Sequence, residues 1–122
     1  MTPETKTAQA IEADPVAAYA KFAGEGDANR FAALIPPHMQ GAMVRWIALG
    51  IPPADFLRAV LDNDLYAACV KADDANAVRL TDFSRFLLNY APGLSFGSPE
   101  AVHNWQRSGG IVGIQNKRER AA

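Results

Sequence analysis

Acidic side chains gather in one part of the sequence. Asp62 and Asp64 are followed closely by Asp73 and Asp74, and carboxylate oxygens are the ligands that hard cations prefer. The spacing nevertheless lacks the glycine and the bidentate glutamate of an EF-hand loop. Aspartate is also common at helix N-termini, where its side chain accepts a backbone hydrogen bond. We therefore predict that these residues cap helices and do not form a metal site.

The histidines and the cysteine form no catalytic pattern. His38 and His103 lie far apart, and neither has a second ligand at the spacing typical of a metal site. Cys69 is the only cysteine, which excludes an internal disulfide and a Cys-based zinc site. It falls in an apolar stripe, where a cysteine is usually a small core residue and not a nucleophile. We predict no catalytic residue and no cofactor, and we expect that the protein is not an enzyme.

Anion binding is a second chemistry that the sequence leaves open. The glycines of Gly24-Glu25-Gly26 lack the third glycine and the Lys-Ser/Thr pair of a phosphate loop. Helix N-termini could still bind an anion through free amides, helped by Arg45, Arg58, Arg79 or Arg85. Arg45 stands next to Trp46, and an aromatic ring beside a cation would suit a nucleotide or a partner protein. The alternative is a solvated arginine beside a core tryptophan.

The totals favour one soluble domain. The chain has 122 residues, 49% of them hydrophobic, and a net charge of −1, so no strong field attracts nucleic acid or an anionic membrane. No apolar run approaches the roughly 18 to 20 residues that span a bilayer. The first six residues contain no basic run followed by an apolar stretch, so we expect no secretory signal. We expect a cytoplasmic protein without a membrane partner.

The spacing of apolar residues predicts an all-α fold. We expect a flexible arm over residues 1–14, a helical domain over residues 15–107 and a flexible tail over residues 108–122. The domain should be a compact bundle of roughly five or six short helices. Asp14, Ser98 and Gly50 are predicted helix caps.

Two helix boundaries in the middle of the chain decide which side chains face inward. Leu65 and Cys69 continue the apolar phase of the helix that ends near Asp62, so this helix either runs on to Lys71 or breaks at Asn63 and Asp64. We favour the break. After it we expect one long helix over residues 75–90, capped by Asp74, with Val78 among its inward residues.

An ordered series of motifs resembles a family of small proteins encoded in bacteriophage and prophage genomes. The series covers about residues 35–107 and consists of Ile35-Pro36-Pro37-His38-Met39, Gly50-Ile51-Pro52-Pro53, Phe56-Leu57, Ala59-Val60-Leu61, Asn63-Asp64-Leu65, Ala72-Asp73-Asp74 with Asn76, Phe86-Leu87 with Asn89-Tyr90 and Pro92, and Gly97-Ser98-Pro99 with Trp105. Family members often have glycine where this chain has Ala54, and a Cys-Trp pair where it has Ser95-Phe96.

The resemblance implies a phage context, and no enzymatic activity comes with it. A small phage protein without catalytic residues is expected to bind a host protein or a host defence complex, as a counter-defence inhibitor. Binding of a nucleotide or nucleic acid, and assembly into a homodimer or another homo-oligomer, are the alternatives. The predicted binding residues are Arg45, Trp46, Asn63, Asp64, Asp73, Asp74, Asn76 and Asn89.

Overall fold

The structure is helical throughout the part that it describes. The computed structural model describes residues 1–121, which form ten α-helices and one 3-10 turn and contain no strand. In chain order these are α1 (Pro3–Ala13), α2 (Pro15–Ala23), α3 (Glu25–Leu34), α4 (Pro37–Leu49), α5 (Asp55–Leu61), α6 (Leu65–Lys71), α7 (Asp74–Ala77), α8 (Leu80–Tyr90), η1 (Gly93–Ser95), α9 (Pro99–Ser108) and α10 (Gly110–Ala121). The all-α class is confirmed, while the predicted number of helices is too low.

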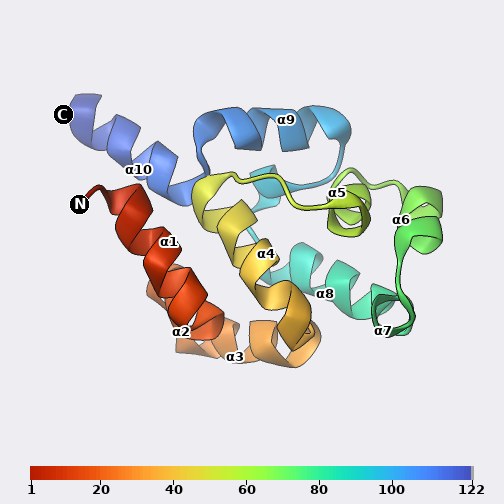
Figure 1. Ribbon diagram of the computed structural model, residues 1–122. Coiled ribbons are helices and arrows are strands. Elements are labelled where there is room, and N and C mark those ends of the chain that lie inside the picture. Colours follow the sequence, from red (N-terminus) through yellow and green to blue (C-terminus); the bar gives the residue numbers. More distant parts are fainter. Residues whose placement is uncertain (122) are drawn as a thin grey trace.

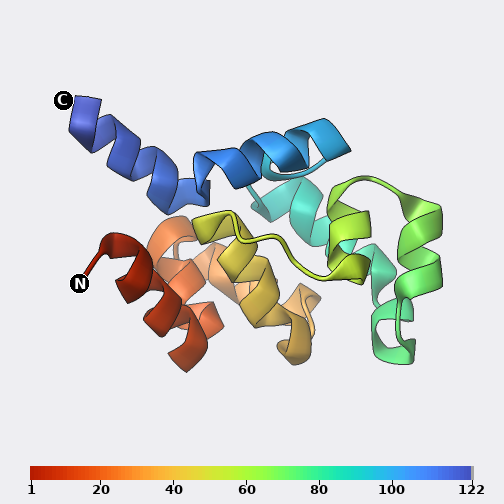
Figure 2. The ribbon, with the colours of Figure 1, turned by 45° about the horizontal axis from the view of Figure 1, so that its top comes forward.

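The two ends of the molecule differ in how their helices pack. Figures 1 and 2 show α1, α2 and α10 at one end and α6 with α7 at the other. Helix α4 packs against α1, α2 and α10, and α3 packs against α8. Helix α6 packs mainly against its neighbour α5. The end that carries α6 is therefore the thinner one.

A cluster of aromatic rings fills the centre of the core. The ring of Phe31 lies 5.0 Å from that of Tyr19 and 5.2 Å from that of Phe86, measured between centroids. The Tyr19 hydroxyl donates a hydrogen bond of 2.7 Å to the Tyr90 carbonyl. Burial of the phenol, helped by the nearby charge of Asp27, raises the pKa of Tyr19 to about 12. These contacts join α2, α3 and α8.

The predicted flexible arm over residues 1–14 is wrong, because most of it is α1. The Thr2 hydroxyl accepts a hydrogen bond of 3.1 Å from the Thr5 amide, and Pro3 occupies the first helical position, where its missing amide is no loss. The Ile11 side chain is buried. Helix α1 therefore begins at a capped start and packs against α2 and α4.

The predicted flexible tail over residues 108–122 is also wrong for the residues that the structure describes. Residues 110–121 form α10, which packs against α4 and α9. Val112 is buried, and the Asn116 amide donates a hydrogen bond to the Glu4 carboxylate of α1. Ala122, the last residue of the predicted tail, lies outside the described residues. Ile111 and Ile114 of the same segment also pack against the core.

The predicted break before α6 is confirmed. Helix α5 ends at Leu61, and Asn63 has a φ of 63°, in the left-handed region. The Asp64 carboxylate then accepts a hydrogen bond of 3.0 Å from the Ala67 amide and caps α6. Because Asn63 has a left-handed backbone conformation, α6 starts in a different direction from α5.

The predicted long helix over residues 75–90 is wrong, because α7 and α8 are separate. Asp73, and not Asp74, caps α7 by accepting a hydrogen bond of 2.7 Å from the Asn76 amide. Val78 follows α7 and is 83% exposed, although it was expected to face inward. The interruption between the two helices releases Val78 from the inward face of α8.

A group of residues that we call the tryptophan junction joins α4, η1, α9 and the start of α10. It consists of Trp46, Gly50, Ser95, Trp105 and Gly110. The indole nitrogen of Trp46 donates a hydrogen bond of 2.9 Å to the Ser95 carbonyl, and that of Trp105 donates one of 3.0 Å to the Trp46 carbonyl. Gly50 and Gly110 have φ values of 67° and 70° where α4 ends and α10 begins. A Cβ atom on Gly110 would lie 2.6 Å from the backbone of α4, so only glycine permits this approach.

The helices are short. The longest helix within the described residues, α4, has 13 residues, whereas a membrane-spanning helix needs about 20. Among residues 1–121, none of the helices has the length and apolar character needed to cross a bilayer.

Candidate functional site

The structure divides the predicted binding residues into two groups. The first group lies at the two ends of α6 and in α7, and it comprises Asn63, Asp64, Asp73, Asp74 and Asn76. The second group lies in α4 and α8, and it comprises Arg45, Trp46 and Asn89.

The second group does not form a site. Trp46 is completely buried, and its indole donates to the Ser95 carbonyl. The predicted aromatic and cationic patch of Arg45 and Trp46 is therefore wrong, because only Arg45 is exposed. The Asn89 amide donates a hydrogen bond of 2.9 Å to the Arg85 carbonyl of its own helix. Each of these residues therefore contacts or faces a different part of the molecule.

Two of the arginines expected to assist anion binding are held by other residues. The Arg58 guanidinium lies 3.2 Å from the Asp62 carboxylate, and the Arg79 guanidinium lies 2.8 Å from that of Asp82. Arg79 also donates a hydrogen bond of 2.7 Å to the Ala33 carbonyl. Arg79 therefore links α8 to the end of α3 through its Nε and Nη2 donors.

The first group contains helix caps and one buried amide. Asp64 and Asp73 cap α6 and α7, as predicted for aspartates in this segment. Asn76 is 4% exposed, and its amide nitrogen lies 3.7 Å from the Met39 sulfur. Its side-chain oxygen has no hydrogen-bond partner within residues 1–121. Leaving such an oxygen unpaired costs about 1 to 3 kcal/mol.

Acidic and histidine side chains in this region do not converge on one point. His38 lies 3.9 Å from the Asp73 carboxylate. In the part of the chain that the structure describes, no three His, Cys, Asp or Glu side chains are placed to hold a metal ion together. The aspartates around α6 therefore act as caps and as surface charges.

Four side chains of α6 form an exposed surface that we call the α6 face. Tyr66 is 85% exposed, Val70 is 83% exposed and Leu65 is 63% exposed. Cys69 is exposed as well, although its apolar neighbourhood predicted a core position. Exposed apolar side chains that lie side by side mark interaction sites more often than scattered ones do.

Helical geometry puts these four side chains on one side of α6. A helix turns by about 100° per residue, so Leu65, Tyr66, Cys69 and Val70 point into an arc of about 140°. Ala68, the buried residue of α6, lies outside this arc. The α6 face is thus continuous and turned away from the core.

Negative charges lie at both ends of the α6 face. Asp64 precedes α6, while Asp73 and Asp74 follow it, and all three are exposed. The nearest cation in the sequence, Lys71, points about 170° from the centre of the face. The site can therefore bind an apolar surface that carries basic groups at its edges.

The sequence predicts that aspartates lie at the ends of this site, but it does not predict the exposed side chains of α6 between them. The Asp64 cap was predicted, but the cap of α7 was assigned to Asp74 and not to Asp73. Leu65 and Cys69 were expected to face inward, and nothing was predicted for Tyr66 and Val70. The signal that was available is the break at Asn63 and Asp64, because a helix that restarts does not keep the phase of the one before it.

Comparison with known proteins gives no match. No protein-family model, curated protein or solved structure matches the chain. The functional interpretation therefore depends on the surface of the molecule and on the motif series.

Proposed function

We propose that the protein is a non-enzymatic binding protein that contacts a host protein through the α6 face. The motif series resembles phage and prophage proteins, and this resemblance suggests the setting. In that setting the protein acts in the cytoplasm of the host cell. Its target is host machinery such as a defence complex, which it inhibits.

The exposure of Tyr66 and Val70 is the observation that carries the proposal. Both side chains are more than four-fifths exposed on adjacent turns of α6. Tyrosine is enriched among the residues that contribute most to binding energy at protein interfaces. Burying these side chains in a complex would recover the free energy that their exposure costs.

The experiment replaces Tyr66 with the photo-cross-linking residue p-benzoylphenylalanine in protein produced in a bacterial host. After irradiation, we expect an adduct with one host protein, identified by mass spectrometry. A second protein with the probe at Leu88, which is 74% exposed on α8, is the matched control and should not form this adduct. Val70→Ser in the Tyr66-labelled protein should reduce its yield.

Two results would contradict the proposal. Equal adducts from positions 66 and 88, or no adduct from position 66, would remove the α6 face as the binding surface. Turnover of a nucleotide, peptide or nucleic-acid substrate that is lost in Asp64→Ala would contradict the non-enzymatic part, provided that circular dichroism shows the variant folded.

A further inference from the structure

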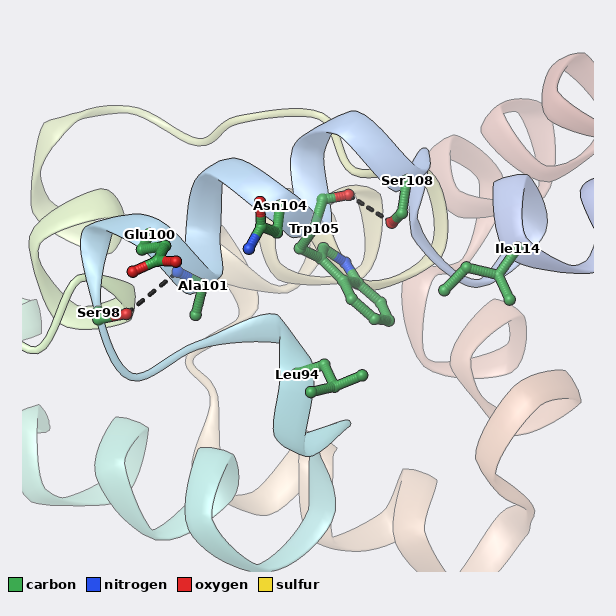
Figure 3. Close-up of a pocket in the computed structure, with 8 residues that line it drawn as sticks. All are labelled: Leu94, Ser98, Glu100, Ala101, Asn104, Trp105, Ser108 and Ile114. Atoms are coloured by element: carbon green, nitrogen blue, oxygen red, sulfur yellow. Dashed lines mark hydrogen bonds between the residues drawn. The ribbon is translucent and has the colours of Figure 1, made fainter.

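A groove between η1, α9 and α10 forms an apolar hollow beside the tryptophan junction. It has a volume of about 430 Å³ and is lined by Leu94, Ser98, Glu100, Ala101, Asn104, Trp105, Ser108 and Ile114. Figure 3 shows the Trp105 ring pointing from α9 toward Leu94, with Ile114 of α10 on one side. Leu94 is 77% exposed, so one wall of the groove is an apolar side chain that nothing covers.

The groove continues into a basic region. A second hollow of about 460 Å³ shares Ser108 and Ile114 with the first and is otherwise lined by Arg107, Lys117, Arg118 and Ala121. None of these three cations belongs to the ion pairs formed within residues 1–121. The combined surface, which we call the α9–α10 groove, is mainly apolar, with Glu100 at one end and the three cations at the other.

The α6 face has the complementary shape, and its aspartates complement the charge of the basic end of the groove. It is a convex apolar helix surface with exposed aspartates at both ends, whereas the groove is concave and ends in free cations. The seven residues of α6 extend over about 10 Å, and the groove follows α9, which extends over about 15 Å. A helix of the length of α6 therefore fits along the groove.

The two surfaces lie apart in the molecule. In Figures 1 and 2, α6 is at the end opposite α10, and α9 lies between them. They cannot meet within one chain, so a contact between them joins different copies.

We infer that the α9–α10 groove binds the α6 face of a second copy of this chain, head to tail. This inference rests on the exposure of the α6 face, as the proposed function does, and names a further partner for that face. A head-to-tail contact uses different surfaces of the two copies and leaves one of each free, so it continues into a ring or a filament. Self-association and host-protein binding then compete for α6.

The concentration dependence of the molar mass is the first test. The contact is small, so multi-angle light scattering is expected to show a mass above the 13.1 kDa monomer only at about 0.1 to 1 mM. Added salt should lower the mass, because it screens aspartates and cations from one another. Leu88→Ser is the matched control and should associate like the unmodified protein.

Two variants that are each defective on one surface test the head-to-tail geometry. The α6 variant is Tyr66→Ser with Val70→Ser, and the groove variant is Lys117→Glu with Arg118→Glu. Each should stay monomeric alone. Their equimolar mixture should form a heterodimer of twice the monomer mass, because one copy supplies an intact groove and the other an intact α6 face.

The outcomes separate this inference from the proposed function. A monomer at every concentration, or a mixture that stays monomeric, overturns the inference. If the position-66 adduct with a host protein persists in that case, the proposed function stands. If the protein associates but position 66 gives only adducts between copies, the proposed function fails and the inference stands.

Discussion

The tryptophan junction and the α6 face use apolar side chains in opposite ways. At the junction, Trp46 is buried, Trp105 is 5% exposed, and both indole nitrogens donate to carbonyls. On the α6 face, Tyr66 and Val70 are almost fully exposed. Large apolar side chains therefore hold the fold together in one region and are left available for contact in the other.

Tyr19 and Tyr66 differ in the same way, because one is buried and the other is exposed. The Tyr19 hydroxyl is bonded to the Tyr90 carbonyl inside the core, whereas Tyr66 lies on the surface. The comparison teaches that residue type alone does not decide whether an aromatic ring stabilises this protein. What decides it is whether neighbouring helices cover the ring.

The largest expected effect is at the tryptophan junction, for Gly110→Ala. The new Cβ would approach the backbone of Ala48 and Leu49 at 2.6 Å, at a φ of 70°. The clash and the left-handed backbone together should lower the free energy of unfolding by about 3 to 5 kcal/mol. Urea unfolding followed by circular dichroism measures this.

Gly93→Ala is the matched control for this glycine. A Cβ at Gly93 meets nothing within 4 Å, so its effect should stay within about 0.5 kcal/mol. Equal losses at Gly93 and Gly110 would show that the close approach of α10 to α4 does not hold the fold.

An intermediate effect is expected for Tyr19→Phe. Loss of the hydrogen bond to Tyr90 should cost about 1 kcal/mol at neutral pH. The pKa of Tyr19 is raised from 10.0 to about 12 in the folded protein, so the folded state keeps this proton more tightly than the unfolded state. The resulting stability is complete below pH 10 and is lost as the pH rises toward 12.

Unfolding measured from neutral to alkaline pH tests the core tyrosine. In Tyr19→Phe this part of the alkaline loss of stability should be absent. Tyr66→Phe is the comparison variant, and at neutral pH it should unfold like the unmodified protein, because its ring is 85% exposed. A pH dependence that Tyr19→Phe leaves unchanged would contradict the role of the buried phenol.

Local capping chemistry made much of the fold predictable. Asp14 accepts a hydrogen bond from the Ala17 amide, and Ser98 accepts one from the Ala101 amide. Gly50 has the left-handed conformation expected after a helix. These interactions join residues a few positions apart, so the sequence contains all the information that they need.

The predictions that are wrong concern features that depend on contacts between residues distant in the sequence. The start of α10 at Gly110 depends on its fit against α4, which no local pattern reveals. The direction of α6 depends on the left-handed Asn63, after which the apolar phase of α5 no longer applies. In the candidate site, therefore, the Asp64 cap was predictable, whereas the Asp73 cap of α7 and the exposed Tyr66 were not.

The smallest expected effect on stability is that of Tyr66→Ser combined with Val70→Ser. Both side chains are more than four-fifths exposed, so their removal should change the free energy of unfolding by less than about 0.5 kcal/mol. The same variant should lose self-association, so its stability measurement also shows that this loss does not come from unfolding. Urea unfolding at a concentration where the unmodified protein is monomeric measures the change. A loss of about 2 kcal/mol or more would place these side chains among those that hold the fold, as at the tryptophan junction, and the contrast between the two regions would then disappear.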